Sequence, residues 1–152
     1  MAVHVTTELD GLQPILAMLN GLGQPRRLAQ GLANIGGLIE NQTKDRITEG
    51  GPSPDGEAWA PWSESYAATR KKGQTLLVAT GAYRDSYAWD LTGDALRVGS
   101  NMVQAAILNF GGTDNMAPGP AAIPARQHLG LSDANVVEIE DAMGDWIEGL
   151  TA

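Results

Sequence analysis

The sequence predicts an α+β fold: a small antiparallel sheet or hairpin packed against one long helix and a C-terminal amphipathic helix, joined by long Gly/Pro-rich loops. Two long stretches, residues 25–49 and 132–150, carry apolar side chains at helical spacing. Two short strand-like segments flank a Thr-Gly-Asp turn. Nineteen glycines and eight prolines among 152 residues indicate many turns, which suits α+β better than a helical bundle. The length and the 43% hydrophobic content fit a single domain with a real core.

The N-terminal 24 residues predict a short strand and a short helix. Val3 and Val5 alternate with polar neighbours over residues 2–6, a strand pattern. Leucines recur at helical spacing over residues 9–20, and Pro14 predicts that this helix starts or kinks there.

The long helix is expected over residues 25–49. Pro25 suits the first helical position, and an apolar stripe follows at spacings of four, three and four: Leu28, Leu32, Ile35 and Ile39. Each glycine inside the helix weakens it by about 1 kcal/mol relative to alanine. Any bend is therefore expected at the pair Gly36-Gly37.

Residues 50–131 are expected to form loops, short helices and the hairpin. Residues 50–56 are a loop by composition, and the tryptophans that follow, Trp59 and Trp62, predict a loop pinned to a core or to a partner. Ser63 is expected to cap a short helix through Thr69, and Thr80 to cap a helical turn over residues 82–86.

The hairpin is predicted from residues 87–91 and 95–99. Residues 104–110 favour a helix that stops at Gly111-Gly112, and residues 113–122 form a flexible loop. Residues 123–131 then lead, through an extended segment and a Leu-Gly-Leu turn, into the last helix.

The last helix has the cleanest pattern in the chain. Ser132 is its expected N-cap. Its apolar stripe has spacings of three, four, three and four: Val136, Ile139, Met143, Trp146 and Leu150. Residues 132–152 hold six acidic residues and no basic one, so the face away from the stripe is acidic.

The charge of the chain disfavours broad DNA binding. The net charge is −8, and affinity for phosphates depends on clustered Lys and Arg. A DNA-binding regulator that uses Arg26, Arg27 and the basic run 70–72 remains an alternative. The N-terminus lacks the pattern of a signal peptide, and no apolar run reaches the length of a membrane span. We therefore expect a protein that is made and retained in the cytoplasm.

Few residues are candidates for catalysis, so no catalytic, cofactor or metal site is predicted. The chain has no cysteine and two histidines, His4 and His128, too few for the usual histidine-rich metal sites. His128 is interpreted as a packing or hydrogen-bonding residue. Acid pairs on the last helix, such as Glu138/Asp141, are interpreted as a solvated face. The enzymatic alternative is a small-substrate enzyme that uses Asp85, Asp141 or His128.

Four short segments, residues 53–61, 77–86, 98–111 and 123–130, carry motifs of glycine, proline and aromatic residues in a fixed order. Together they resemble the phage virion morphogenesis family, the tail completion proteins of tailed bacteriophages. Residues 53–61 match its Pro-Asp-Gly-x-x-Trp-x-Pro loop, and residues 77–86 match Leu-x-x-Thr-Gly-x-Leu-x-x-Ser. Residues 98–111 match Val-Gly-Ser followed by Tyr-Ala-x-x-His-Gln-Phe-Gly, and residues 123–130 match Ile-Pro-Ala-Arg-x-Phe-Leu-Gly. The chain departs from this pattern at Ala105, Leu108, Asn109 and His128. The order and spacing of the segments over residues 40–150 carry the resemblance.

The resemblance implies a structural protein of the neck or upper tail that acts as a ring, commonly a hexamer, at the head–tail junction. A tail terminator or a head-side stopper is the alternative within the same class. The implied partners are copies of the chain and other neck and tail proteins, such as connector, stopper and tail tube, with DNA passing through the channel without specific binding. Arg126 is expected to pin a long loop or a neighbouring subunit. The candidate interface or motif residues are Asp55, Gly56, Trp59, Trp62, Gly81, Arg84, Ser86, Phe110, Gly111, Pro124, Arg126, His128, Leu129 and Gly130.

Overall fold

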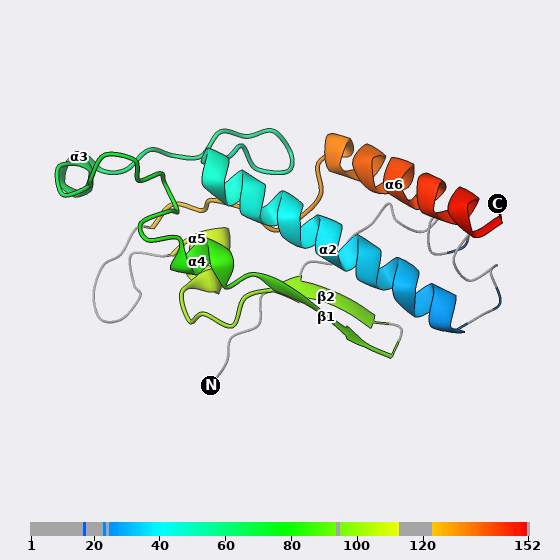
Figure 1. Ribbon diagram of the computed structural model, residues 1–152. Coiled ribbons are helices and arrows are strands. Elements are labelled where there is room, and N and C mark those ends of the chain that lie inside the picture. The colour runs from blue at the N-terminus through cyan, green and yellow to red at the C-terminus, as the bar shows by residue number, and fades with distance from the viewer. Residues whose placement is uncertain (1–16, 18–22, 24, 94, 113–122, 152) are drawn as a thin grey trace.

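The computed structural model describes residues 17, 23, 25–93, 95–112 and 123–151 (Figure 1). The elements follow in the order α2 (Pro25–Glu49), α3 (Glu64–Ala67), α4 (Ala82–Asp85), β1 (Ala88–Thr92), β2 (Ala95–Gly99), α5 (Ala105–Phe110) and α6 (Asp133–Thr151). This confirms the predicted α+β class. The predicted strand over residues 2–6, the helix over 9–20 (apart from Ala17) and the loop over 113–122 lie outside the described residues.

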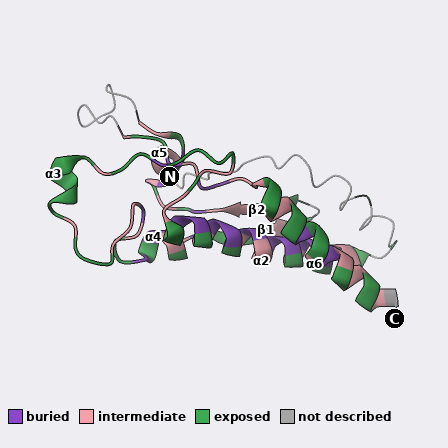
Figure 2. Cartoon of the chain, turned by 90° about the horizontal axis from the view of Figure 1, so that it is seen from above, coloured by how far each residue is buried: buried purple, intermediate pink, exposed green. Residues whose placement is uncertain are grey.

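Helix α2 is the central element of the fold. It lies between the β1–β2 hairpin on one side and α6 on the other (Figure 1). The predicted stripe of α2 is buried, with Leu32, Ile35 and Ile39 packed against Ile139 and Met143 of α6. Figure 2 shows the buried residues following one side of α2. Burying each large aliphatic side chain contributes about 1.5–3 kcal/mol, so this layer supplies much of the stability.

Gly36 lets the hairpin approach α2 closely. The antiparallel register pairs Trp89 with Val98 and Leu91 with Leu96. A Cβ at Gly36 would lie 2.8 Å from Leu96 Cδ1 and 2.8 Å from Trp89 Cδ2. The helix runs through Gly36-Gly37 without a break (Figure 1). Gly36 is therefore explained by packing against the hairpin.

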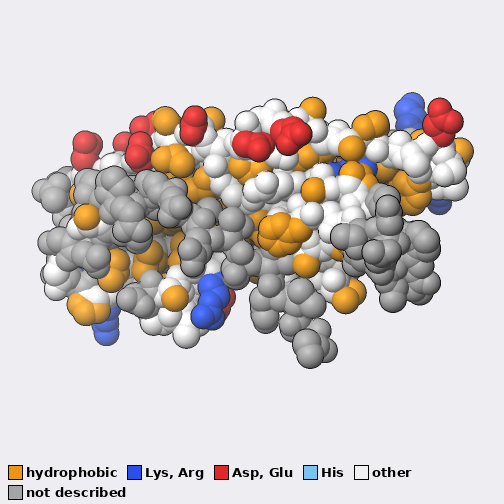
Figure 3. Space-filling view, turned by 180° about the vertical axis from the view of Figure 1, so that it is seen from behind, with side chains coloured by type: hydrophobic (Ala, Val, Ile, Leu, Met, Phe, Trp, Pro, Cys, Tyr) orange, Lys and Arg blue, Asp and Glu red, His pale blue; other side chains and the backbone are white. Residues whose placement is uncertain are grey.

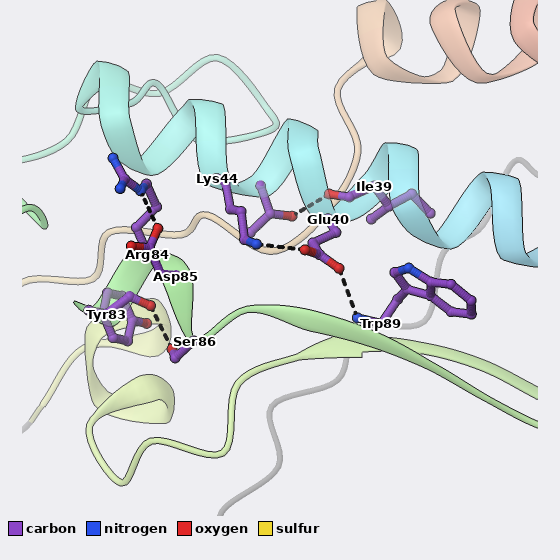
Figure 4. Close-up of polar contacts among 9 residues, drawn as sticks. Ile39, Glu40, Lys44, Tyr83, Arg84, Asp85, Ser86 and Trp89 are labelled. Carbon is purple, nitrogen blue, oxygen red and sulfur yellow. Dashed lines mark hydrogen bonds and ion pairs between the residues drawn. The ribbon is translucent and has the colours of Figure 1, made fainter. Parts of the chain in front are cut away.

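A carboxylate also joins α2 to the hairpin (Figure 4). Glu40 Oε1 accepts from Lys44 Nζ at 2.6 Å, one helical turn along α2. Glu40 Oε2 accepts from the backbone N–H of Trp89 at 3.2 Å. Glu40 thus fixes the start of β1 against the helix.

A second core lies at the carboxyl-terminal end of α2. It gathers buried residues from segments far apart in the chain: Ile47, Trp59, Leu77, Tyr83, Tyr87, Ala105 and Leu129. Figure 1 shows α4 and α5 close together in this region, while α3 lies well away from the other helices and strands. The short helices and the long loops are therefore organised around this end of α2.

The start of α6 confirms the predicted Ser132 cap. Ser132 Oγ accepts from the backbone N–H of Asn135 at 3.2 Å, and Asn135 Oδ1 accepts from the backbone N–H of Ser132 at 3.2 Å. Such reciprocal bonds satisfy backbone donors that a helix N-terminus leaves open. The stripe faces α2, with Ile139 and Met143 fully or almost fully buried. All the acidic residues of α6 up to Glu148 are exposed.

Two local predictions need correction. The helix after Ser63 ends at Ala67 instead of Thr69, although Ser63 Oγ does accept from Tyr66 N–H at 3.4 Å. The N-cap of α4 is Gly81 instead of Thr80, because the chain enters α4 with a φ of +90°, a conformation that glycine adopts readily. Thr80 also supports the start of α4, because its Oγ1 accepts from the backbone N–H of Ala82 at 3.3 Å.

Candidate functional site

The segment before α6 is held by buried polar side chains, which we call the polar cluster: Arg46, Tyr83, Tyr87, Asn109, Arg126 and His128. These residues come from α2, α4 and its C-terminal flank, α5, and the segment that precedes α6. The cluster contains two of the predicted site residues and brings them together with four that were not predicted.

His128 is at the centre of the cluster and has no exposed surface. Its Nδ1 lies 2.6 Å from the carbonyl oxygen of Arg126, and because a carbonyl only accepts, Nδ1 carries the proton. Its Nε2 lies 2.8 Å from Tyr83 Oη and 2.5 Å from Tyr87 Oη, and the two hydroxyls are 2.8 Å apart. One hydroxyl donates to Nε2 and the other donates to the first hydroxyl. Every polar atom of the neutral imidazole is therefore satisfied.

Burial sets the ionisation of these groups. Desolvation, reinforced by the charge of Arg46, lowers the pKa of His128 to about 4, although its bond to the Arg126 carbonyl opposes the shift. Burial likewise raises the pKa of Tyr83 to about 12, and it raises the pKa of Tyr87 further. The cluster is neutral at these three positions at physiological pH. A general base must reach a substrate proton, and His128 is closed off from any substrate.

Arg46 anchors the segment before α6 to the last turns of α2. Its Nη1 donates to the carbonyl oxygens of His128 at 2.8 Å and Gly130 at 3.1 Å, and its Nη2 donates to Asn135 Oδ1. Burial lowers the pKa of Arg46. The sequence analysis missed this residue. The sequence does hold a sign of its burial, because Arg46 lies seven positions after Ile39 and so falls on the buried stripe of α2.

Asn109 holds the same segment from the side of α5. Its Oδ1 accepts from the backbone N–H groups of His128 and Leu129, each at 3.0 Å, and its side chain is 1% exposed. Its Nδ2 is buried without a hydrogen-bond partner in the described part of the chain. Asn109 was noted in the sequence only as a departure from the family pattern.

Arg126 binds a loop of its own chain. Its Nε and Nη2 donate to the carbonyl oxygen of Ala60 at 3.1 and 2.9 Å, and Nη2 also donates to the carbonyl oxygen of Pro61 at 3.2 Å. The side chain is 7% exposed, and burial lowers its pKa. Of the two expected roles of Arg126, the structure shows the loop contact.

The tryptophans were predicted to pin their loop to a core or to a partner, and for Trp59 the structure shows contact with the chain's own core. The Trp59 ring is 8% exposed, and its Nε1 donates to Ser53 Oγ and to the Gln127 carbonyl oxygen, both at 3.1 Å. Its ring also meets His128 edge-on, with centroids 6.2 Å apart. Trp62 is half-buried and donates to the Leu76 carbonyl oxygen at 3.3 Å. The loop is therefore pinned to the chain's own core.

The other predicted residues mostly shape turns around the cluster. Asp55 Oδ1 accepts from Glu57 N–H at 3.1 Å and so closes the turn that contains Gly56. Ser86 Oγ donates to the Tyr83 carbonyl oxygen at 2.6 Å (Figure 4). Gly81 is the N-cap of α4. Within α4, Arg84 forms an exposed ion pair with Asp85, with Nε and Oδ1 2.7 Å apart.

The last predicted residues surround the junction itself. A Cβ at Gly111, where φ is +83°, would lie 3.0 Å from Ala125 N, so only glycine lets the two segments pack this closely. Gly130 packs on Pro54 in the same way, with a Cβ distance of 3.0 Å. Leu129 is buried, whereas Pro124 is exposed and Phe110 is 63% exposed.

Comparison with known proteins decides the family. The model of the phage virion morphogenesis family matches residues 8–148. The chain belongs to the phage virion morphogenesis family. Putative capsid assembly protein G of Escherichia phage Mu is 38% identical over 145 residues, which cover 93% of this chain and 91% of the relative. No solved structure matches.

Family membership gives the protein a structural or assembly role in a phage virion. The matched range starts at residue 8, so it includes N-terminal residues that the motif resemblance hardly covered. Among the described residues, no helix is long and apolar enough to span a membrane, and no three His, Asp or Glu side chains are grouped to bind a metal ion.

Proposed function

We propose that this member of the phage virion morphogenesis family is a tail completion component of the phage neck, which forms a ring where the tail meets the head. One observation carries the proposal: the polar motif residues before α6 serve to fix loops. Arg126 donates to the Ala60 carbonyl oxygen and so holds that loop, and the buried His128 is hydrogen-bonded to Tyr83 and Tyr87. Such a scaffold suits a protein that presents shaped surfaces to neighbours.

The remaining candidates for catalysis also support a role without enzymatic activity. Asp85 is engaged with Arg84 in an exposed ion pair on α4, and Asp141 is exposed on α6. His128, the third residue of the enzymatic alternative, is buried. These three residues belong to different elements and form no common site.

Different faces of the chain suit a head-to-tail ring. A heterologous contact needs two distinct surfaces on each subunit. Val103 and Phe110, 77% and 63% exposed, provide an apolar surface at α5. The acidic face of α6 is kept apart from the subunit contacts in this arrangement and faces the channel, where it would repel DNA phosphates. The proposed partners are further copies of the chain, the connector or stopper, and the tail tube.

The ring can be tested with purified protein. Native mass measurement and electron microscopy would be applied to the chain alone and with tail tube subunits. We expect a closed ring, a hexamer in the simplest case, in at least one of the two conditions. A strictly monomeric mass in both conditions would contradict the proposal.

A further inference from the structure

A projecting basic surface forms one end of the molecule. We call it the basic tip: Trp62, Tyr66, Arg70, Lys71 and Lys72. Figures 1 and 2 both show α3, which carries Tyr66, lying apart from the other elements and far from α6. No residue of α3 is buried. Within the described residues, the ammonium groups of Lys71 and Lys72 contact no acidic group.

The basic tip is organised before any partner binds. The Arg70 guanidinium lies 4.9 Å from the Tyr66 ring centroid and 5.6 Å from that of Trp62. Its Nη1 donates to Tyr66 Oη at 2.6 Å, and its Nε donates to Gln74 Oε1 at 2.8 Å. Trp62 and Tyr66 meet edge-on, with centroids 6.0 Å apart. Holding these side chains in place reduces the entropy lost on binding.

A pocket of about 290 Å³ lies where the end of α2 meets the start of α6. We call it the acidic pocket, because Asp45, Glu49 and Glu138 line it. Gln42 also lines it and is 7% exposed, and its Nε2 donates to the Asn135 carbonyl oxygen at 3.3 Å and to Glu138 Oε2 at 2.7 Å. Its Oε1 is buried and accepts from no donor among the described residues. A buried acceptor without a donor is costly and is usually matched by a partner.

The acidic pocket keeps its negative character although Arg46 also lines it. The Arg46 guanidinium donates to the His128 and Gly130 carbonyls and to Asn135, which are neutral groups, so its positive charge remains. The carboxylates of Asp45, Glu49 and Glu138 outnumber this one cation in the lining. Figure 3 shows Asp and Glu side chains along the edge of the molecule that carries α6, and Lys or Arg beside an acidic side chain at the end where α3 lies. Glu64 of α3 is acidic, so Arg70, Lys71 and Lys72 outnumber it at the basic tip.

We propose that the basic tip of one copy of the chain docks into the acidic pocket of the next copy. The charges are complementary, and the ammonium groups of Lys71 and Lys72 would donate to the exposed carboxylates of Asp45 and Glu49. The tip and the pocket are different surfaces, so repeating the contact builds a head-to-tail assembly that closes when the rotation allows. The inference rests on the proposed ring and names the contact that builds it.

Charge reversal tests the contact. Lys71→Glu with Lys72→Glu, and separately Asp45→Lys with Glu49→Lys, should each weaken self-association about tenfold or more at low salt, since screening by salt shortens the reach of surface charges. The four substitutions on one chain should restore it. The matched controls are Arg26→Glu with Arg27→Glu and Asp141→Lys with Asp145→Lys, which change the same charge elsewhere. Sedimentation velocity measures the association, and circular dichroism checks the fold.

Cross-linking gives an independent readout, because the natural chain has no cysteine. A full-length chain with Lys72→Cys and Asp45→Cys should form a ladder of disulfide-linked oligomers on mild oxidation. The control pair Lys72→Cys and Asp145→Cys, whose second position lies outside the pocket, should not.

The outcomes separate the two proposals. If the unmodified chain assembles but the reversals behave like the controls and no ladder forms, the tip-to-pocket contact is wrong and the ring stands. If the reversed basic tip loses retention on DNA while assembly is unchanged, the contact is also wrong. If the unmodified chain never assembles, alone or with tail tube subunits, the ring proposal fails as well.

Discussion

Arg126 donates two hydrogen bonds to the carbonyl oxygen of Ala60, 66 positions away in the sequence, from Nε at 3.1 Å and from Nη2 at 2.9 Å. Lysine has no planar pair of donors and cannot reproduce this geometry. We expect Arg126→Lys to lower the free energy of unfolding by about 2–3 kcal/mol, because buried carbonyls lose their donors. Urea unfolding measures the change. Arg97→Lys on the exposed side of β2 is the control, and an equal effect of both substitutions would contradict the role of Arg126.

The depressed pKa of His128 makes stability depend on pH. The folded state keeps His128 neutral down to about pH 4, whereas the unfolded chain protonates it near its ordinary pKa of 6.5. The unfolded state therefore binds more protons between these values, and the stability contributed by this group is lost as pH falls from about 6.5 to about 4. The full loss is about 3 kcal/mol.

His128→Phe isolates this contribution. Phenylalanine is the residue that the family pattern has at this position, and it carries no ionisable group. We expect a cost of about 1–2 kcal/mol at pH 7, from the lost hydrogen bonds, and a smaller decrease in unfolding free energy between pH 6.5 and 4.5 than in the natural chain. Parallel slopes for the two proteins would refute the assignment.

Neighbouring glycines of α2 should respond in opposite ways to alanine. A Cβ at Gly36 would lie within 3 Å of the Trp89 ring, so Gly36→Ala should destabilise by about 1–3 kcal/mol despite the better helix propensity of alanine. At Gly37 the nearest atom is Trp89 Nε1 at 3.9 Å, an ordinary contact. Gly37→Ala should therefore stabilise by up to about 1 kcal/mol. Thermal unfolding of both variants measures these changes in stability. A change of the same sign in both variants would show that the hairpin does not pack against Gly36.

Asn109→Ala should destabilise the junction before α6. The substitution removes the acceptor shared by the His128 and Leu129 N–H groups, and leaving buried donors unpaired costs about 1–3 kcal/mol each. Hydrogen exchange should speed up at these two amides specifically. The exposed Asn101→Ala serves as the control. Unchanged protection of both amides would show that Asn109 is dispensable.

The elements that were predicted are those whose signal is local. Pro25 and the leucine–isoleucine stripe predicted α2, and Ser132 with its stripe predicted α6, because start signals and periodicity lie within one segment. The hairpin followed from two short segments around Thr92-Gly93. His128 was interpreted as a packing residue, and its full burial and complete hydrogen bonding agree with that interpretation.

The residues that were missed depend on contacts between distant segments. Arg46 and the His128 carbonyl that it binds are 82 positions apart, and Asn109 binds amides 19 and 20 positions away. No short motif encodes such pairs. For the same reason the sequence left open whether Trp59 contacts the core or a partner, since its indole donates to the distant Gln127 carbonyl oxygen.

The proposed joining role is tested most directly by electron microscopy of phage particles made without this protein. The account predicts separate filled heads and tails, or tails of abnormal form, with normal particles restored when the chain is supplied in trans. Intact, infectious particles in its absence would contradict the central claim.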